Sequence, residues 1–242
     1  MSQPDSQDAE TVTLRPGVLG APVECPVVWR RSARARRVSL RIDPRAAQVV
    51  VTLPTRSSRR AGMALLTTHA AWVMQRLAGL APVVQLAPGT EVPIGGRPHV
   101  IRHDPRARGG AWLEPGAIVV TGAEEFLPRR VADFLRAEAK RRITALAALH
   151  AEALEVKPRA IRMKDTNSRW GSCAPDGILA FSWRLVMAPD WVLDYVVAHE
   201  VAHLREMNHS ARFWAHVEKR TPHKDAAVEW LREHGPALLR VG

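Results

Sequence analysis

Hydrophobic and polar residues alternate along the first part of the chain in the manner of β-strands. The run Val38–Ile42 alternates strictly, and the apolar run Val49–Leu53 follows after a connection over Asp43–Ala47, so the pair predicts a β-hairpin. Beyond the hairpin, apolar residues spaced three and four apart predict one helix over about Ser57–Gly79. The first residues, up to about Ala21, carry few apolar side chains and are expected to be disordered.

The rest of the pattern mixes short strands with longer helices. The stretch Pro82–Gly122 is rich in proline and glycine, which indicates turns between short strands. Strands are expected at His99–Arg102, Ala117–Thr121, Ala160–Met163 and Ile178–Ser182, and helices at Pro128–Leu154, Ser210–Arg220 and Lys224–His234, with Gly235 as the cap of the last. We therefore predict an α+β fold. Its expected parts are a tail over residues 1–21, a β-rich subdomain with one helix over 22–125 and a C-terminal domain over 126–242.

The most specific pattern in the chain is His199-Glu200-Val201-Ala202-His203. On a helix, residues four apart lie about 40° from each other and one turn apart, so both imidazoles can reach one metal ion. Glu200 falls on the same side, where its carboxylate can touch a water on the metal without being a ligand. The apolar residues that precede the motif indicate a buried helix, and Pro189 suits its first turn. Such a helix is typical of a zinc hydrolase, in which two histidines hold the ion and the glutamate takes a proton from the water.

A catalytic zinc site needs a third protein ligand, with its fourth position open for water. The best candidate is His209, six residues after His203. A continuous helix would turn His209 about 240° away from His203. The helix is therefore expected to end at Met207-Asn208, because asparagine tolerates the left-handed backbone that ends helices. Glu206 is a rival ligand, but it lies about 10 Å beyond His199 along the helix axis. Further acidic rivals are Glu218 and Glu229.

A wider set of short motifs accompanies these histidines. The motifs are Ser168-Arg169-Trp170-Gly171-Ser172-Cys173, Gly177-Ile178, Trp183-Arg184-Leu185, Tyr195–Leu204, Asn208-His209-Ser210 and Phe213-Trp214. Together they resemble the YgjP-like zinc metallopeptidases, which are relatives of the SprT and Spartan proteases, and the resemblance covers nearly everything from Arg30 to Gly235. It implies a zincin-like C-terminal metallopeptidase domain that binds one Zn²⁺ per chain. The ligands and general base that it implies are His199, His203, His209 and Glu200.

Composition is consistent with a cytoplasmic enzyme. No apolar run approaches the ~20 residues that a membrane-spanning helix needs. The segment Met1–Glu10 is polar and acidic and lacks the features of a secretory signal peptide. The two cysteines, Cys25 and Cys173, are too few for a disulfide framework, and Cys173 is expected to act as a small buried hydrophobic residue. We therefore expect a cytoplasmic protein with no membrane partner.

Basic charge is concentrated in the N-terminal half. Residues 21–60 contain ten arginines against two acidic residues, whereas residues 166–242 contain nine residues of each sign. A basic N-terminal β-rich subdomain of this kind could make weak, non-specific contacts with a nucleic-acid backbone. Aromatic residues make up only 5% of the chain, so a platform for stacking single-stranded bases is poorly supported. The arginines that could follow a phosphate backbone are Arg30, Arg31, Arg34, Arg36 and Arg37.

The region before the metal helix is expected to shape the substrate groove. Zincins lay an extended substrate along an edge strand, and Ile178–Ser182 is the candidate for that strand. Arg169 and Arg184 could face the cleft and stabilise an oxyanion. For Arg184, an ion pair with a carboxylate such as Asp194 is an equally good interpretation. Tyr195, one turn before His199, is either a hydrogen-bond donor near the metal or a packing ring.

The favoured hypothesis is a zinc-dependent metallopeptidase that cleaves a peptide or protein substrate with a metal-activated water and Glu200 as general base. A first alternative keeps the same site but cleaves a phosphoanhydride, for example of a nucleotide, with basic residues gripping the phosphates. A second alternative is a nucleic-acid-associated module with a structural metal. An open fourth position argues against that alternative, because structural zinc sites are normally closed by four protein ligands.

Overall fold

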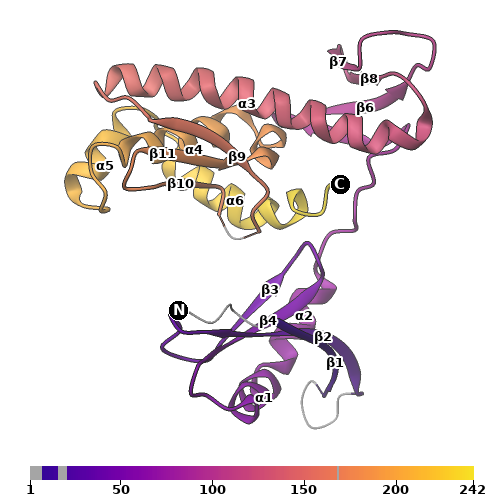
Figure 1. Cartoon of the computed structure of the whole chain (residues 1–242), viewed down its shortest axis with the longest axis vertical. Coiled ribbons are helices and arrows are strands. Elements are labelled where there is room, and N and C mark those ends of the chain that lie inside the picture. Colours follow the sequence, from indigo (N-terminus) through magenta and orange to yellow (C-terminus); the bar gives the residue numbers. More distant parts are fainter. Residues whose placement is uncertain (1–6, 16–20, 168) are drawn as a thin grey trace. The chain divides into compact units, whose positions relative to one another are not determined.

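The computed structural model describes residues 7–15, 21–167 and 169–242, and they form a mixed α+β protein (Figure 1). The chain divides into two compact units, residues 1–82 and residues 83–242. Each unit has its own hydrophobic core. The boundary thus lies at 82/83, not between 125 and 126 as the sequence pattern predicted. The reason is that the strands after residue 90 bury their apolar side chains in the same core as the long helix that follows them.

The first unit is a four-stranded sheet covered by two helices. The strands lie in the order β1 (Gln7–Leu14), β2 (Val23–Ser32), β4 (Gln48–Pro54) and β3 (Ser39–Asp43), with β2 and β4 parallel and the other pairs antiparallel. The expected hairpin is confirmed, because β3 and β4 pair directly after each other in the chain. The prediction that the chain is disordered up to Ala21 is wrong for β1, because Val12 and Leu14 of this strand are buried in the core. Residues 1–6 and 16–20 lie outside the described residues.

The single helix expected at Ser57–Gly79 is wrong, because the structure has α1 (Arg59–Thr68) and α2 (Ala70–Ala78) with a break at His69. The hydroxyl of Thr68 donates a hydrogen bond to the carbonyl of Ala64 at 2.9 Å, and such a bond competes with the helix ladder and bends it. Both helices still place apolar residues against the sheet, which is why the spacing pattern continues across the break.

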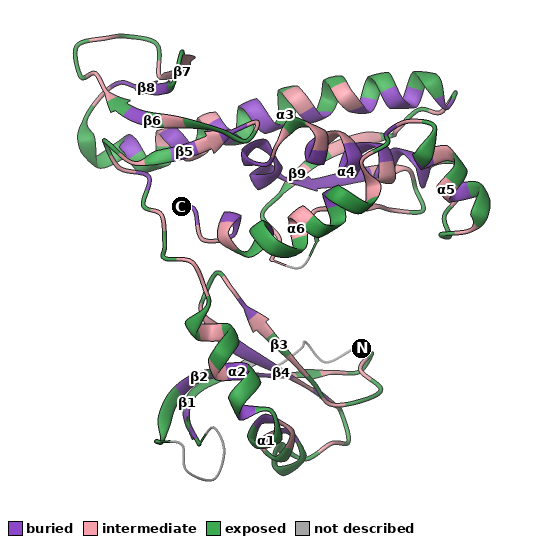
Figure 2. Cartoon of the chain, turned by 180° about the vertical axis from the view of Figure 1, so that it is seen from behind, coloured by how far each residue is buried: buried purple, intermediate pink, exposed green. Residues whose placement is uncertain are grey.

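The second unit contains two small sheets joined by one long helix. The first sheet has the order β5 (Glu91–Ile94), β6 (Arg97–His103), β8 (Ala117–Val120) and β7 (Ala111–Glu114), and the second has the order β10 (Gly171–Cys173), β11 (Ile178–Ser182) and β9 (Ala160–Lys164). The long helix α3 (Leu127–Ala153) follows a 3-10 turn, Glu124–Phe126, and contacts both sheets (Figure 1). Figure 2 shows buried and exposed residues alternating along α3, as expected for a helix that covers a core with one face.

Three further helices complete this unit. They are α4 (Asp190–Ala202), α5 (Ala211–Glu218) and α6 (Lys224–Leu238), and a 3-10 segment, Trp183–Met187, precedes α4. Most of α4 is buried, because it packs against α3, α5, α6 and β10. The prediction of a buried helix is therefore confirmed. The cap predicted at Gly235 is wrong: α6 continues past this residue, where a β-carbon would lie 2.8 Å from the Trp170 ring.

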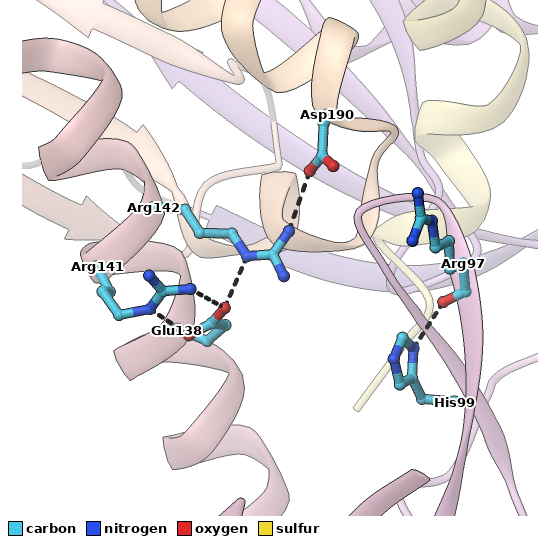
Figure 3. A network of polar contacts seen from close by, with 6 residues as sticks. All are labelled: Arg97, His99, Glu138, Arg141, Arg142 and Asp190. Atoms are coloured by element: carbon cyan, nitrogen blue, oxygen red, sulfur yellow. Dashed lines mark hydrogen bonds and ion pairs between the residues drawn. The ribbon is translucent and has the colours of Figure 1, made fainter. Parts of the chain in front are cut away.

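The start of α4 is tied to α3 by a network of ion pairs (Figure 3). Glu138 on α3 accepts hydrogen bonds from Arg141 and Arg142, and Arg142 also donates to the carboxylate of Asp190 at 3.0 Å. These two arginines, Arg141 first, hold the pKa of Glu138 down at about 2, although its burial opposes them. The first residue of α4 is thus fixed to the longest helix of the unit. Among the described residues, no helix is long and apolar enough to cross a membrane.

Candidate metal centre

Three histidines from the end of α4 and the segment after it come together. His199 lies in the last turn of α4, His203 is the residue that ends the helix, and His209 follows six residues later. Their candidate ligand atoms all lie within 4.8 Å of one another. Among the residues that the structure describes, this is the one group of three or more histidine, cysteine or acidic side chains with that geometry.

The separation of the imidazole nitrogens suits a zinc ion. Nε2 of His199 and Nε2 of His209 are 3.3 Å apart. Two nitrogens that bind one tetrahedral zinc at 2.0–2.1 Å are also about 3.3 Å apart. Burial and the two neighbouring histidines lower the pKa of His199 to about 4, and burial lowers the pKa of His203 as well. Both rings are therefore neutral near pH 7, which is the form that binds a metal ion.

The chain leaves the helix earlier than the sequence predicted. The expected end at Met207-Asn208 is wrong, because α4 ends at Ala202 and the next amides bond to carbonyls three residues back. Asn208 is also not in the left-handed conformation. Its side-chain oxygen instead accepts a hydrogen bond from the amide of Ser210 at 3.1 Å. That bond shapes the turn that carries His209 back to the helix end.

The acidic rivals do not join the histidines. Glu206 contributes its backbone carbonyl, which lies 3.0 Å from Nδ1 of His203 and so orients that ring. Its carboxylate instead pairs with Arg212 at 3.1 Å. Glu218 and Glu229 are likewise outside the cluster.

Aromatic rings enclose the histidines, and sequence reasoning gave them no role. The ring of Phe213 stacks on His203 at 4.4 Å between centroids and lies within 5 Å of the other two imidazoles. Trp214 contacts His199 and His209 at 5.8 and 5.6 Å. Ser210, whose hydroxyl accepts from the Phe213 amide, starts the helix that presents both rings. This serine, three residues before the phenylalanine, was the available signal for the start of α5.

Glu200 is buried beside the cluster, with 7% of its surface exposed. Burial raises the pKa of its carboxyl group to about 7, and the nearby Arg169 and the backbone of Cys173 oppose that rise. A β-carbon on Gly171 would lie 2.5 Å from Cγ of Glu200, so only glycine lets β10 approach so closely. A carboxyl group with a pKa near neutrality can both take and return a proton.

The other predicted contact residues have different outcomes. Arg169 is exposed and close enough to Glu200 to influence its charge. Tyr195 is 6% exposed, and its ring centroid lies 5.9 Å from that of His199. Arg184 does not face a cleft: it is buried, pairs with Asp165 and donates to the carbonyl of Val241 at 3.1 Å. The ion-pair interpretation therefore holds for Arg184 with a different carboxylate.

The partner expected for Arg184 is used elsewhere. Asp194 lies 2.8 Å from Nε2 of the buried His150 on α3. That contact joins α4 to α3 five residues before His199.

The strand expected to hold the substrate is not an edge strand. Ile178–Ser182 forms β11, which is paired with β10 on one side and β9 on the other. The edge strand that contacts α4 is β10, a three-residue strand that periodicity could not reveal. The five N-terminal arginines all lie in the first unit, on β2 or in the connection to β3: Arg30, Arg31, Arg34, Arg36 and Arg37.

Two histidines one helical turn apart, a third beyond the helix end and a buried glutamate between them form an arrangement typical of a metal-dependent hydrolase centre. The family model for the YgjP-like metallopeptidase domain matches residues 36–234. The chain belongs to this YgjP-like family and is a metal-dependent protease. No curated protein matches its sequence significantly. A similar solved structure is that of the metallopeptidase zymogen abylysin of Pyrococcus abyssi, 21% identical over 38% of this chain and 92% of that one, with a TM-score of 0.34.

Proposed function

We propose that this protein is a zincin-like peptidase that binds one zinc ion through His199, His203 and His209 and uses Glu200 as general base. The observation that carries the proposal is the trio of imidazoles within 4.8 Å of one another beside a buried carboxyl group. A zinc ion bound there would polarise the scissile carbonyl and acidify a water molecule.

Glu200 handles the proton in this scheme. Its carboxylate accepts a proton from the attacking water, and the same oxygen then gives the proton to the nitrogen of the departing amine. A pKa near 7 suits both steps, because the group must be ionised at the first and protonated at the second. Arg169, which favours the ionised form, is the proposed contact for the substrate or transition state. Tyr195 acts through His199, against which its ring packs.

The substrate is proposed to bind along β10. The carbonyl of Trp170 and the amide of Ala174 bond to β11, so in an antiparallel pair Gly171 and Cys173 direct their backbone groups away from β11. The backbone of Cys173 already bonds to the Glu200 carboxyl group, and an extended peptide could add to the remaining groups of that edge as a further strand, held by main-chain hydrogen bonds. The edge is next to Glu200, which places a peptide bond near the proton acceptor.

The site is tested by comparing variants on a peptide substrate. Glu200→Gln should keep the metal and the fold and lose hydrolysis, and His199→Ala should lose the metal, as measured by metal analysis of the purified protein. The matched control is Glu206→Gln, which removes a neighbouring carboxylate whose side chain pairs only with Arg212 among the described contacts. It should keep both metal and activity. Unchanged turnover in Glu200→Gln, or full metal content in His199→Ala, would refute the assignment.

We also propose that the first unit makes weak, non-specific contacts with nucleic acid. Arg34, Arg36 and Arg37 are exposed on the connection between β2 and β3, and Arg31 is exposed at the end of β2. Exposed guanidinium groups on one short segment favour a phosphate backbone without reading bases.

A further inference from the structure

A small polar pocket lies along β10. It has a volume of about 230 Å³. Its lining comes from β10 and β11, from the last residue of β9 and from residues between β9 and β10. The lining residues are Lys164, Thr166, Arg169, Trp170, Gly171, Ser172, Ala180, Phe181 and Ser182.

The pocket carries positive charge with no acidic residue in its lining. Its two cations are the Lys164 ammonium and the Arg169 guanidinium, and both residues are exposed. Within the described part of the chain, neither forms an ion pair with a carboxylate. The nearest acidic residue in sequence, Asp165, is paired with Arg184. An anionic group that enters the pocket would therefore meet two cations without displacing an internal partner.

The pleat of β10 relates the pocket to the site of cleavage. A β-carbon on Gly171 would point at Glu200, so the side chain of Ser172, the next residue, points to the opposite face, and Ser172 lines the pocket together with its cross-strand partner Ala180. A peptide laid along β10 alternates its side chains in the same way. If one residue of the bound peptide points toward α4, the residues before and after it in the peptide point toward the pocket. The pocket is thus placed to receive a side chain, or the chain end, next to the cleaved bond.

We infer that this pocket is a subsite for a carboxylate of the substrate, supplied either by an aspartate or glutamate next to the cleaved bond or by a free C-terminus. The inference rests on the proposed peptidase function and on binding along β10. It makes the enzyme selective for acidic peptides, or for cleavage close to a chain end.

The test is a set of matched peptides with glutamate, glutamine or lysine at each position around one cleaved bond, each made as the free acid and as the C-terminal amide. Selectivity at an internal position indicates a side-chain carboxylate, and selectivity for the free acid indicates the chain end. Lys164→Glu should lower kcat/KM for the preferred acidic peptide about tenfold relative to its neutral analogue. The matched control is Arg162→Glu, two residues earlier on the same strand and outside the pocket lining. It should leave the ratio near that of the unmodified protein.

Binding separates the subsite from the catalytic proposal. The Glu200→Gln protein should bind a labelled acidic peptide more tightly than its neutral analogue, and Lys164→Glu in that background should remove the difference. If the unmodified protein cleaves no peptide but this difference is present, the peptidase mechanism fails and the subsite stands. Equal treatment of acidic and neutral peptides in both assays overturns the subsite. Stronger competition by a nucleoside triphosphate than by the acidic peptide overturns it in favour of a phosphate site.

Discussion

Replacing Gly171 by alanine should disable Glu200 without changing any residue proposed to bind the metal. The added β-carbon would lie 2.5 Å from Cγ, 2.6 Å from Oε1 and 2.8 Å from Cδ of Glu200. Carbon atoms in ordinary contact are about 3.5–4.0 Å apart, so the carboxyl group must move by about 1 Å or the strand must move away from α4. The first change displaces the proton acceptor relative to the histidines, and the second displaces the strand edge that is proposed to hold the substrate.

The expected effect on catalysis is large compared with the effect on folding. A misplacement of about 1 Å at a reacting group can cost about 100-fold in rate. Overpacking by one methyl group in a dense interior costs about 1–3 kcal/mol of folding free energy. Gly171→Ala should therefore fold, keep its metal and lose about 100-fold in kcat.

The assay is kcat for a peptide substrate, measured beside metal content and urea unfolding. Gly62→Ala is the matched control, because its β-carbon would lie 2.6 Å from the ring of Trp29, inside the core of the first unit. It should cost similar stability and leave kcat almost unchanged. If Gly171→Ala turns over at the normal rate, or if both variants lose the same activity, the close approach of β10 to Glu200 does not control catalysis.

Three further predictions concern pH, stability and partners. In metal-free protein the raised pKa of Glu200 lowers stability as pH rises from 4.5 to about 7, and the pKa of His199, lowered to about 4, lowers stability as pH falls below 6.5. The two trends offset each other between pH 4.5 and 6.5, and Glu200→Gln removes the Glu200 contribution. The metal-free variant should therefore lose about 3 kcal/mol of unfolding free energy between pH 6.5 and 4 in denaturant unfolding. A flat profile would contradict this. Glu138→Gln should lower the free energy of unfolding by about 2 kcal/mol at pH 7, as measured in urea. The lowered pKa of Glu138 stabilises the fold at pH values above 4.5, and that contribution is lost as the pH falls through about 2. A cost under about 0.5 kcal/mol would show that the network is dispensable. Binding to random duplex DNA should weaken steeply with salt. Replacing Arg34, Arg36 and Arg37 by glutamate should abolish this binding and leave the metal content intact. Persistent binding would exclude this segment as the contact.

The parts of the site that lie on one helix were predictable from the sequence. Helix geometry places His199 and His203 on one face one turn apart, and the apolar residues before them indicate a buried helix. His209 was identifiable as the best candidate for the third ligand from its place six residues after His203, although the turn that returns it was misplaced. That turn depends on bonds from the amides after Ala202 and on the Asn208 side chain, which leave no periodic signal.

The parts that depend on contacts between distant segments were not predictable. Strand β10 is too short to show alternation, and its glycine is required by a side chain almost thirty residues away. Gly235 looked like a helix cap, yet it lies inside α6, where a β-carbon would meet the ring of Trp170. The boundary between the units was placed too late, since the apolar residues of β5, β6 and β8 gave no sign of which helix they would meet.

The three histidines differ in burial, and this difference sets a route for metal exchange. His203 is 8% exposed and is fixed to the end of a buried helix, whereas His209 is exposed on a turn between two helices. Local opening of a surface turn needs far less free energy than the movement of a core helix. An ion held by the three proposed ligands could therefore leave when His209 alone swings outward, with α4 still in place. Chelators should then strip the metal at a rate that does not depend on global unfolding, and the emptied protein should reload without refolding.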